Sequence, residues 1–178
     1  KINKPLSLYG ATKAANELIA YSYSNLYELN TTGLRFFTVY GPWGRPDMAL
    51  FIFTKNIISG IPIKVFNNGK MKRDFTFIDD VTDAVYRIFT DFQISRNNYE
   101  IFNIGSGQQV SLNKFINLLE KIIGKKANKK LLPMQKGDVK NTSSMNNKII
   151  NSYKYKVNYK LQEGLKKFVD WYKTYYKI

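Results

Sequence analysis

A tyrosine and a lysine four residues apart, Tyr9 and Lys13, are the side chains of this sequence best suited to acid–base chemistry. Residues four apart in a helix lie on the same face, one turn from each other. A free phenol titrates near ~10, which is too high for a base at neutral pH, but a neighbouring positive charge favours the phenolate. Such a pair can accept a proton from a substrate hydroxyl. The plainer alternative is a surface pair on an amphipathic helix, because this spacing is common.

The amino-acid composition makes a tyrosine-based mechanism more attractive. The chain has 178 residues, of which 44% are hydrophobic and 15% aromatic, and this suits one globular core. It contains no cysteine, so we expect no disulfide and no thiolate metal site. It contains no histidine either, and histidine is the usual metal ligand and the usual general base. We therefore expect no metal in the site.

Positive charge dominates the chain, because 28 lysines and arginines face 13 acidic residues, a net charge of +15. Such a surplus can indicate binding to nucleic acid or to a membrane surface. The lysines are spread along the sequence, however, and the densest group, 124–130, is predicted to be a loop. We interpret the charge as a lysine-rich composition combined with an anionic substrate, and we do not expect nucleic acid as a partner.

No stretch of the sequence predicts a membrane or secretory segment. No apolar run approaches the ~20 residues that a membrane-spanning helix needs. No signal peptide opens the sequence. We expect no membrane partner and a cytoplasmic location.

The residues around Tyr9 and Lys13 predict a helix followed by a strand. Apolar residues recur at helical spacing from Lys13 to about Asn30, where the pattern breaks. Residues 34–40 are rich in β-branched and aromatic side chains and predict a strand. A helix that leads into such a strand is half of a β–α–β unit, so we expect a parallel sheet. The loop 41–46 leaves the carboxyl end of the strand, where open α/β sheets bind ligands.

The rest of the chain alternates between helical and strand patterns. Helices are predicted over 50–59, 81–92, 112–123 and 161–176, and strands over 63–66, 75–78 and 99–104. Asp79 or Asp80 is expected to cap the second of these helices, and Ser111 the third. Gly105-Ser106-Gly107 is interpreted as a turn rather than a phosphate loop, because a lone G-x-G is a weak signal. Residues 151–160 are polar and predict a loop.

Six stretches of the sequence resemble, in order, the motifs of one enzyme family. They are residues 5–17 around the tyrosine–lysine pair, then 32–49, 70–81, 103–106, 132–139 and 164–172. The first resembles the Tyr-x-x-x-Lys signature of the extended short-chain dehydrogenase/reductase superfamily. The set is most similar to UDP-glucuronate 4-epimerases of the NAD-dependent epimerase/dehydratase family. The resemblance covers essentially the whole chain and implies NAD as cofactor, a UDP-sugar as substrate, and a role in cell-surface polysaccharide synthesis.

The resemblance also implies which part of such an enzyme the sequence represents. Family members begin with a strand, a glycine-rich turn and a helix that hold the NAD pyrophosphate. No G-x-G-x-x-G or related motif precedes Tyr9, and the family's upstream catalytic serine or threonine is not found. The sequence therefore resembles the C-terminal half of an epimerase. We expect this fragment to be inactive alone, and to form a homo-oligomer or to associate with a missing N-terminal half.

The fold implied by the resemblance is α/β, with the C-terminal part of a Rossmann-like parallel sheet plus a small α/β substrate-binding domain. Residues 1–48 would be the C-terminal remnant of the NAD-binding domain and carry the Tyr-x-x-x-Lys pair. Residues 49–178 would be mainly the nucleotide-sugar substrate-binding domain, with return strands interleaved into the sheet.

Three residues are implied to act on or near the cofactor. By resemblance, Tyr9 takes the proton from the sugar O4, Lys13 supports it and binds the nicotinamide ribose, and Phe37 contacts the cofactor. Hydride would move from C4 to NAD and return to the other face of the 4-keto sugar, so no net oxidation results.

Four residues are implied substrate ligands. Thr38 and Arg45 would hold the C6 carboxylate of the uronic acid. This carboxylate is β to the transient ketone, and β-keto acids lose carbon dioxide easily. A bidentate arginine contact can resist the geometry of that loss. Arg73 would bind the diphosphate and Asp138 the uridine ribose.

Plainer alternatives remain open for these residues and for the chain. Thr38 and Arg45 could be an ordinary strand residue and a loop cation, and Arg73 could pair with Asp74 or Asp79. For the function, one alternative is another nucleotide-sugar epimerase, dehydratase or decarboxylase of the same family. The other is a non-catalytic basic binding module.

Overall fold

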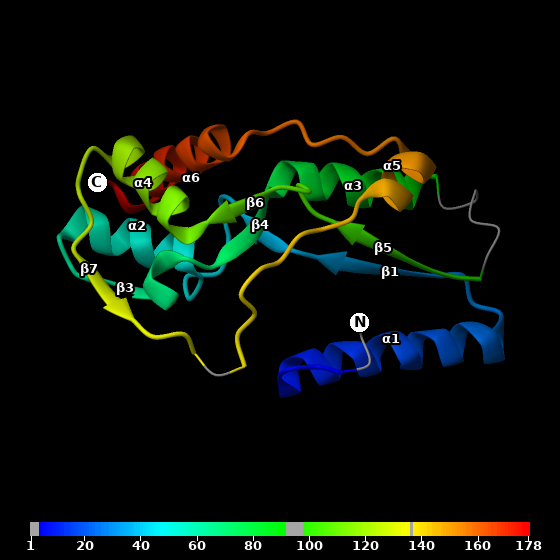
Figure 1. Ribbon diagram of the computed structural model, residues 1–178. Helices are drawn as coiled ribbons and strands as arrows, with labels where there is room; N and C mark the ends of the chain where they lie inside the picture. Colours follow the sequence, from blue (N-terminus) through cyan, green and yellow to red (C-terminus); the bar gives the residue numbers. More distant parts are fainter. Residues whose placement is uncertain (1–3, 92–97, 136) are drawn as a thin grey trace.

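The computed structural model describes residues 4–91, 98–135 and 137–178, and helices alternate in it with short strands (Figure 1). The helices are α1 (Leu8–Tyr27), α2 (Ala49–Ser59), α3 (Ile78–Thr90), α4 (Leu112–Ile123), α5 (Asn147–Tyr153) and α6 (Leu161–Tyr176), with a 3-10 turn at Asn67–Gly69. The strands are β1 (Thr31–Phe36), β2 (Thr38–Tyr40), β3 (Ile63–Phe66), β4 (Lys72–Phe77), β5 (Tyr99–Ile104), β6 (Gln109–Ser111) and β7 (Lys129–Leu132). The predicted α/β class is confirmed.

Parallel pairing dominates the strands, as the β–α–β pattern predicts. β1 pairs in parallel with β5 along its whole length, from Thr31 opposite Tyr99 to Phe36 opposite Ile104. β2 pairs in parallel with β4, and β4 also pairs antiparallel with β6. β3 pairs in parallel with β7. Parallel neighbours need crossover connections, and the helices between them supply these.

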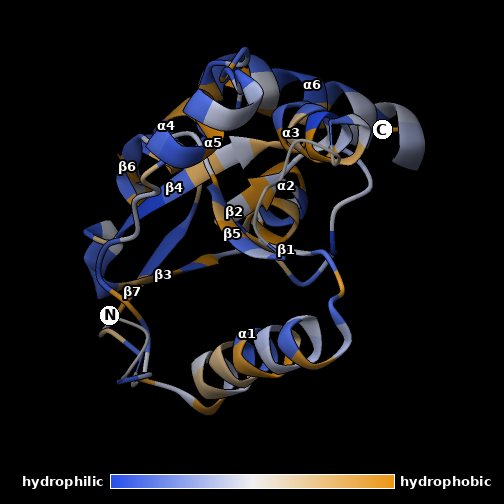
Figure 2. Ribbon diagram, turned by 90° about the vertical axis from the view of Figure 1, so that its right-hand side faces the viewer, coloured by the Kyte–Doolittle hydropathy of each residue, from blue (hydrophilic) through white to orange (hydrophobic). Residues whose placement is uncertain are grey.

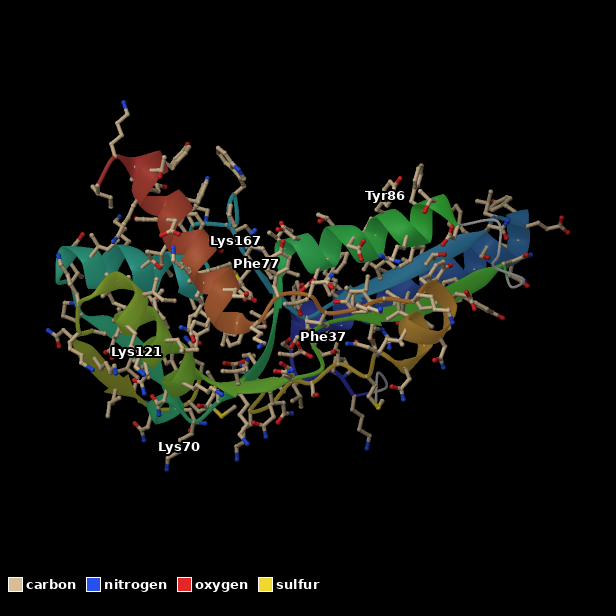
Figure 3. All side chains as sticks on the ribbon, turned by 90° about the horizontal axis from the view of Figure 1, so that it is seen from above. Phe37, Lys70, Phe77, Tyr86, Lys121 and Lys167 are labelled. Carbon is tan, nitrogen blue, oxygen red and sulfur yellow. The ribbon has the colours of Figure 1, made fainter. Side chains whose placement is uncertain are left out.

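The chain changes from one sheet to the next at Phe37. We predicted one strand over 34–40, and this was wrong, because β1 ends at Phe36 and β2 begins at Thr38. The two strands have different partners, β5 and β4, so the ladder must break between them. The Phe37 N–H donates to the carbonyl oxygen of Ile104 at the end of β5, 3.3 Å away. Figure 3 places Phe37 near the middle of the molecule, between two groups of elements.

Two hydrophobic clusters hold these groups together. The first packs α2, α4 and α6 against β3 and β4, and the second packs α3 and α5 against β5 (Figure 1). Members without exposed surface are Ile63, Val65, Phe115, Ile116, Leu119, Leu165 and Phe168 in the first cluster and Ala84, Phe102 and Ile104 in the second. Burial of a large apolar side chain contributes about 1.5–3 kcal/mol. These clusters, rather than the polar loops, therefore carry most of the stability.

The two predictions of helix caps have different outcomes. Ser111 caps α4, and its hydroxyl accepts from the backbone N–H three residues on, at 3.2 Å. The prediction for Asp79 and Asp80 was wrong, because both lie inside the first turn of α3. Asp80 is fully buried, and its carboxylate accepts from the N–H groups of Asn158 and Tyr159 at 2.9 and 3.3 Å. Burial raises the pKa of Asp80, and it outweighs these hydrogen bonds, which act to lower the pKa. The same hydrogen bonds fix the loop before α6.

The remaining differences arise at element ends and in short polar elements. α1 begins at Leu8, before the predicted start, because the Ser7 hydroxyl accepts from the Gly10 N–H at 3.1 Å and caps the helix. β4 and α3 also begin before the predicted residues, and the predicted end of that helix, Phe92, lies outside the described residues. The prediction of a loop over 151–160 was partly wrong, because α5 extends into it. β6 and β7 were not predicted, since pairing with β4 and β3 defines them.

A buried carboxylate, Glu120, fixes the approach to β7. Its side chain is 4% exposed, accepts from the Ala127 N–H at 3.0 Å and pairs with Lys129 at 3.0 Å. Burial alone would raise the pKa of Glu120, but these hydrogen bonds and positive charges outweigh burial and lower the pKa below its usual value of 4.5. Because β7 leads into the segment with Asp138, this contact supports one end of the site.

We predict that Glu120→Gln lowers the free energy of unfolding at neutral pH by about 2 kcal/mol, the size of lost bonds to a charged group. The stabilisation by the ionised carboxylate is complete above pH 4.5 and is lost as the pH falls through the lower folded-state pKa. Urea unfolding at about pH 7 and about pH 3 measures the free energy of unfolding of both proteins. The difference in this free energy between wild type and Glu120→Gln should shrink at the lower pH.

Asp170→Asn is the control for this prediction, because it breaks an exposed pair with Lys166 on α6. It should change the free energy of unfolding by no more than about 0.5 kcal/mol at either pH. An equal loss at both pH values in Glu120→Gln would show that the charge of Glu120 does not stabilise the fold.

Candidate active site

Tyr9 and Lys13 lie on one face of α1, as their spacing predicts. The Lys13 ammonium is 5.4 Å from the centroid of the Tyr9 ring, within range of a cation–π contact. Tyr9 is 72% exposed, so its hydroxyl is open to a ligand. Both residues line a cleft of about 560 Å³ between α1 and β1, together with Glu17, Arg35 and Tyr99. Figure 2 shows α1 lying below the rest of the elements.

Polar contacts hold α1 against β1 and β5. In α1, all of which the structure describes, Ser24 alone is buried. The Arg35 guanidinium donates two hydrogen bonds to the Glu17 carboxylate, both at 2.6 Å. The Tyr99 hydroxyl donates to the Glu17 carbonyl oxygen at 2.9 Å. The hydrogen bond from Arg35 lowers the pKa of Glu17, and that carboxylate raises the pKa of Arg35, so each member of the pair stabilises the other's charge.

Thr38 and Arg45 follow the carboxyl end of β1. Thr38 begins β2, opposite Phe75 of β4. Arg45 lies in the next loop, and its guanidinium donates two hydrogen bonds to the Asp47 carboxylate at the surface. The hydrogen bonds to Asp47 raise the pKa of Arg45.

Arg73 and Asp138, which are far apart in the sequence, contact each other. Nη2 of Arg73, on β4, lies 2.7 Å from Oδ1 of Asp138. The two side chains are 19% and 30% exposed, so the pair is half-buried but open to a ligand. The alternative that Arg73 pairs with Asp74 or Asp79 was wrong. The structure thus brings together the two residues that we assigned to the nucleotide end of the site.

The turn that carries Asp138 also contacts the start of α1. A Cβ at Gly137 would lie 3.5 Å from the carbonyl oxygen of Leu6 and 3.9 Å from the Cβ of Ser7. Gly137 has φ of 79°, which favours glycine. In Figure 1 the yellow segment after β7 descends to the first turn of α1. The Arg73–Asp138 pair and Tyr9 therefore lie near the same end of this helix.

Gly105-Ser106-Gly107 is a turn whose N–H groups are already used. The N–H groups of Ser106 and Gly107 donate to the Asp74 carboxylate at 2.7 and 3.0 Å, so they do not form a phosphate loop, in agreement with our interpretation. Sequence reasoning missed Asp74. An acidic residue inside a strand, next to buried aromatic residues, is the signal that could have found it.

The Glu17–Arg35 pair was also missed. Arg35 is the one charged residue of β1, it lies between Leu34 and Phe36, and such a residue needs a partner. The partner, however, lies one element earlier in the chain, and no local pattern identifies it.

Over residues 4–91, 98–135 and 137–178, no group of three or more histidine, cysteine, aspartate or glutamate side chains could hold a metal ion. None of the helices within the described part of the chain is long and apolar enough to cross a lipid bilayer.

The fold and these side chains define a Rossmann-like α/β protein with a tyrosine–lysine pair beside the carboxyl ends of its strands. The sequence pattern of the NAD dependent epimerase/dehydratase family matches residues 1–105, more than half of the chain, and the chain belongs to this family.

Known members of the family are similar to nearly the whole chain. Protein CapI of Staphylococcus aureus is 46% identical over 99% of this chain and 57% of its own length. A probable UDP-glucuronate 4-epimerase of Rhizobium meliloti is 40% identical over 99% of this chain and 56% of its own length. UDP-glucuronic acid 4-epimerase from Bacillus cereus, solved in complex with UDP-glucuronic acid and NAD, is 35% identical with a TM-score of 0.89, over 97% of this chain and 55% of that chain. The chain thus spans about half the length of these relatives.

We predict that Arg35→Lys loosens α1, because a lysine cannot reproduce two parallel hydrogen bonds to the Glu17 carboxylate. Backbone amides of α1 should exchange with deuterium about tenfold faster, which corresponds to one lost charge-assisted bond. Hydrogen exchange read by mass spectrometry measures this.

Arg87→Lys is the matched control, because it changes an arginine that pairs with Asp83 within α3. It should leave exchange in α1 unchanged. Wild-type exchange of α1 in Arg35→Lys would mean that the Glu17–Arg35 pair does not hold this helix.

Proposed function

We propose that this chain supplies the acid–base pair and the substrate-binding part of an NAD-dependent UDP-sugar 4-epimerase that interconverts UDP-glucuronate and UDP-galacturonate. The observation that carries the proposal is that Tyr9 and the Arg73–Asp138 pair lie near the same end of α1. The relative from Rhizobium meliloti and the complex of the Bacillus cereus enzyme with UDP-glucuronic acid and NAD support it.

Tyr9 is the proposed proton acceptor for the sugar O4 hydroxyl. Its exposed ring lies in the open cleft, and the Lys13 ammonium beside it offers donors for a ribose hydroxyl. Both side chains are accessible, as residues that receive a cofactor must be, and Phe37 is the third residue proposed to contact it. NAD, when bound, supplies a reversible hydride acceptor for the sugar C4.

Arg45 and Thr38 are proposed to bind the C6 carboxylate. The Arg45 guanidinium already holds one carboxylate, that of Asp47, in a two-point contact. The side chains of Arg45 and Asp47 are 75% and 61% exposed. Exposed ion pairs contribute only about 0–1 kcal/mol to stability. A substrate carboxylate can therefore replace Asp47 at little cost and keep the bidentate geometry.

Arg73 and Asp138 are proposed to bind the diphosphate and the ribose. A guanidinium suits phosphate oxygens, and a carboxylate accepts from ribose hydroxyls. A nucleoside diphosphate offers a phosphate to the first and a hydroxyl to the second, so it can satisfy both members of the pair at once.

The chain is proposed to need a partner for activity. We assign residues 1–48 to the NAD-binding domain and residues 49–178 mainly to the substrate-binding domain. Because the chain spans about half the length of its relatives, we expect it to be inactive alone. Leu18 and Leu26 on α1 and Phe89 on α3, on the other side of the strands, are 68%, 70% and 79% exposed, and exposed apolar side chains of this kind are suited to cover by a partner. A second copy or an N-terminal half would cover them.

Isothermal titration calorimetry with UDP-glucuronate, UDP-glucose, UDP and a short DNA duplex tests the proposed function. We expect UDP-glucuronate to bind about tenfold more tightly than UDP-glucose, the contribution of one charge-assisted contact. Arg45→Met should remove this preference without weakening UDP. Lys64→Met changes an exposed cation on β3 and should leave all affinities unchanged.

The other outcomes separate the alternatives. Equal affinity for UDP-glucose and UDP-glucuronate would favour another nucleotide sugar as substrate. DNA binding that falls steeply with salt, without binding of any nucleotide sugar, would contradict the proposal and favour a basic binding module.

A further inference from the structure

Asp74, next to Arg73 on β4, carries a fully buried carboxylate that the proposed chemistry does not use. Successive residues of a strand point to opposite faces, so Arg73 can face the surface while Asp74 faces the interior. No ion pair between described residues includes Asp74. A buried carboxylate is costly unless other groups hydrogen-bond to it, so its donors indicate its role.

Two separate loops supply most donors to this carboxylate, and the Thr76 hydroxyl on β4 adds a longer hydrogen bond of 3.4 Å. In the turn after β5, the N–H and the hydroxyl of Ser106 both donate at 2.7 Å, and the Gly107 N–H donates at 3.0 Å. In the segment before α5, the N–H and the hydroxyl of Ser144 donate at 2.8 and 2.6 Å. Charge-assisted hydrogen bonds thus join β4 and both loops at Asp74.

The segment that ends at Ser144 is the one that carries Asp138. In its middle, it runs beside β4. The Lys72 N–H donates to the carbonyl oxygen of Lys140 at 2.9 Å, and the Thr142 N–H donates to the carbonyl oxygen of Lys72 at 3.1 Å. The segment 138–144 is therefore fastened to β4 by the arginine at one end, by backbone bonds in the middle, and by the buried carboxylate at the other end.

Packing around Ser144 leaves little room for adjustment. A Cβ at Gly105 would fall 2.3 Å from the Ser144 hydroxyl and 3.0 Å from Oδ2 of Asp74. The side chains of Asn146 and Tyr155 both donate to the carbonyl oxygen of Gly105, at 2.7 and 3.1 Å. The turn at Gly105 therefore packs tightly against Ser144 and is itself held by hydrogen bonds. If Ser144 moves, we expect the segment before it to move as well.

We propose that Asp74 is a positioning residue for the nucleotide end of the site, because its carboxylate fixes the segment 138–144 on β4 and so holds Asp138 opposite Arg73. The inference rests on the proposed function, in which those two residues bind the nucleotide. A carboxylate that only stabilised the fold would have no separate effect on nucleotide affinity.

Two variants of the 178-residue chain test the role of Asp74. Asp74→Asn keeps the shape of the side chain but replaces an acceptor oxygen by a donor, which then faces the N–H and hydroxyl donors. Asp80→Asn is the matched control. Asp80 is equally buried and accepts from two backbone N–H groups, but these belong to Asn158 and Tyr159, outside the segment 138–144. Hydrogen exchange without nucleotide and calorimetric titration with UDP are measured for both variants and for wild type.

We expect Asp74→Asn to speed exchange over 139–144 and to weaken UDP binding by about tenfold or more, the effect of one lost charge-assisted bond. Asp80→Asn should speed exchange at 158–159 and keep the affinity for UDP within about twofold of wild type. Wild-type exchange over 139–144 in Asp74→Asn, an unchanged affinity in that variant, or an equal loss of affinity in both variants would overturn the proposal.

The failure of this inference is distinguishable from that of the proposed function. If the wild-type chain does not bind UDP, the proposed function fails, and the exchange measurement, which needs no ligand, still decides whether Asp74 holds the segment. If Asp74→Asn does not fold, Ser144→Ala takes its place, since it removes one hydroxyl donor and keeps the N–H. Faster exchange over 139–142 with weaker UDP binding would then support the proposal, and wild-type behaviour in both would overturn it.

Discussion

The change of strand partner at Phe37 is the constraint on which the site depends. β1 must lie beside β5 and β2 beside β4, so the chain passes from one sheet to the other within a single residue. Thr38 pairs with Phe75, and Arg73 lies two residues before Phe75 on β4. This places Arg73 beside the crossing at Phe37. The crossing lies where the carboxyl ends of β1 and β5 meet, and in α/β proteins ligands bind at the carboxyl ends of strands where the connectivity changes. The residues proposed to bind the substrate, such as Thr38 and Arg73, therefore come together through strand pairing, although they are far apart in the sequence.

Acidic side chains supply the internal polar contacts and leave the surface basic. The carboxylates of Asp74, Asp80 and Glu120 are buried, and each accepts hydrogen bonds from the backbone of a loop. They tie the turn after β5, the loop before α6 and the approach to β7 to the helices and strands. Because these three negative charges point inward, the surface is more basic than the net charge of +15 alone indicates. Such a surface attracts an anionic nucleotide sugar over a Debye length of about 8–10 Å.

Features set by neighbouring residues could be predicted from the sequence, whereas those set by distant contacts could not. α4, with its cap and apolar stripe, and the strands β3 and β5 match their predicted ranges. The break at Phe37, the strands β6 and β7 and the donors to Asp80 depend on elements elsewhere in the chain. The site shows the same division. The shared face of Tyr9 and Lys13 follows from their spacing, but the contact between Arg73 and Asp138 joins residues 65 positions apart. No local pattern encodes that contact or the donors to Asp74.

The most direct test of the proposed substrate site is to map where UDP-glucuronate contacts the chain, by following backbone amide signals in nuclear magnetic resonance spectra during a titration. We expect the largest shifts at Arg73, at 137–139 and around Thr38 and Arg45, with the basic loop 124–130 unaffected. Shifts centred on that loop, or no shifts at saturating ligand, would contradict the claim that this chain carries the substrate site of a nucleotide-sugar epimerase.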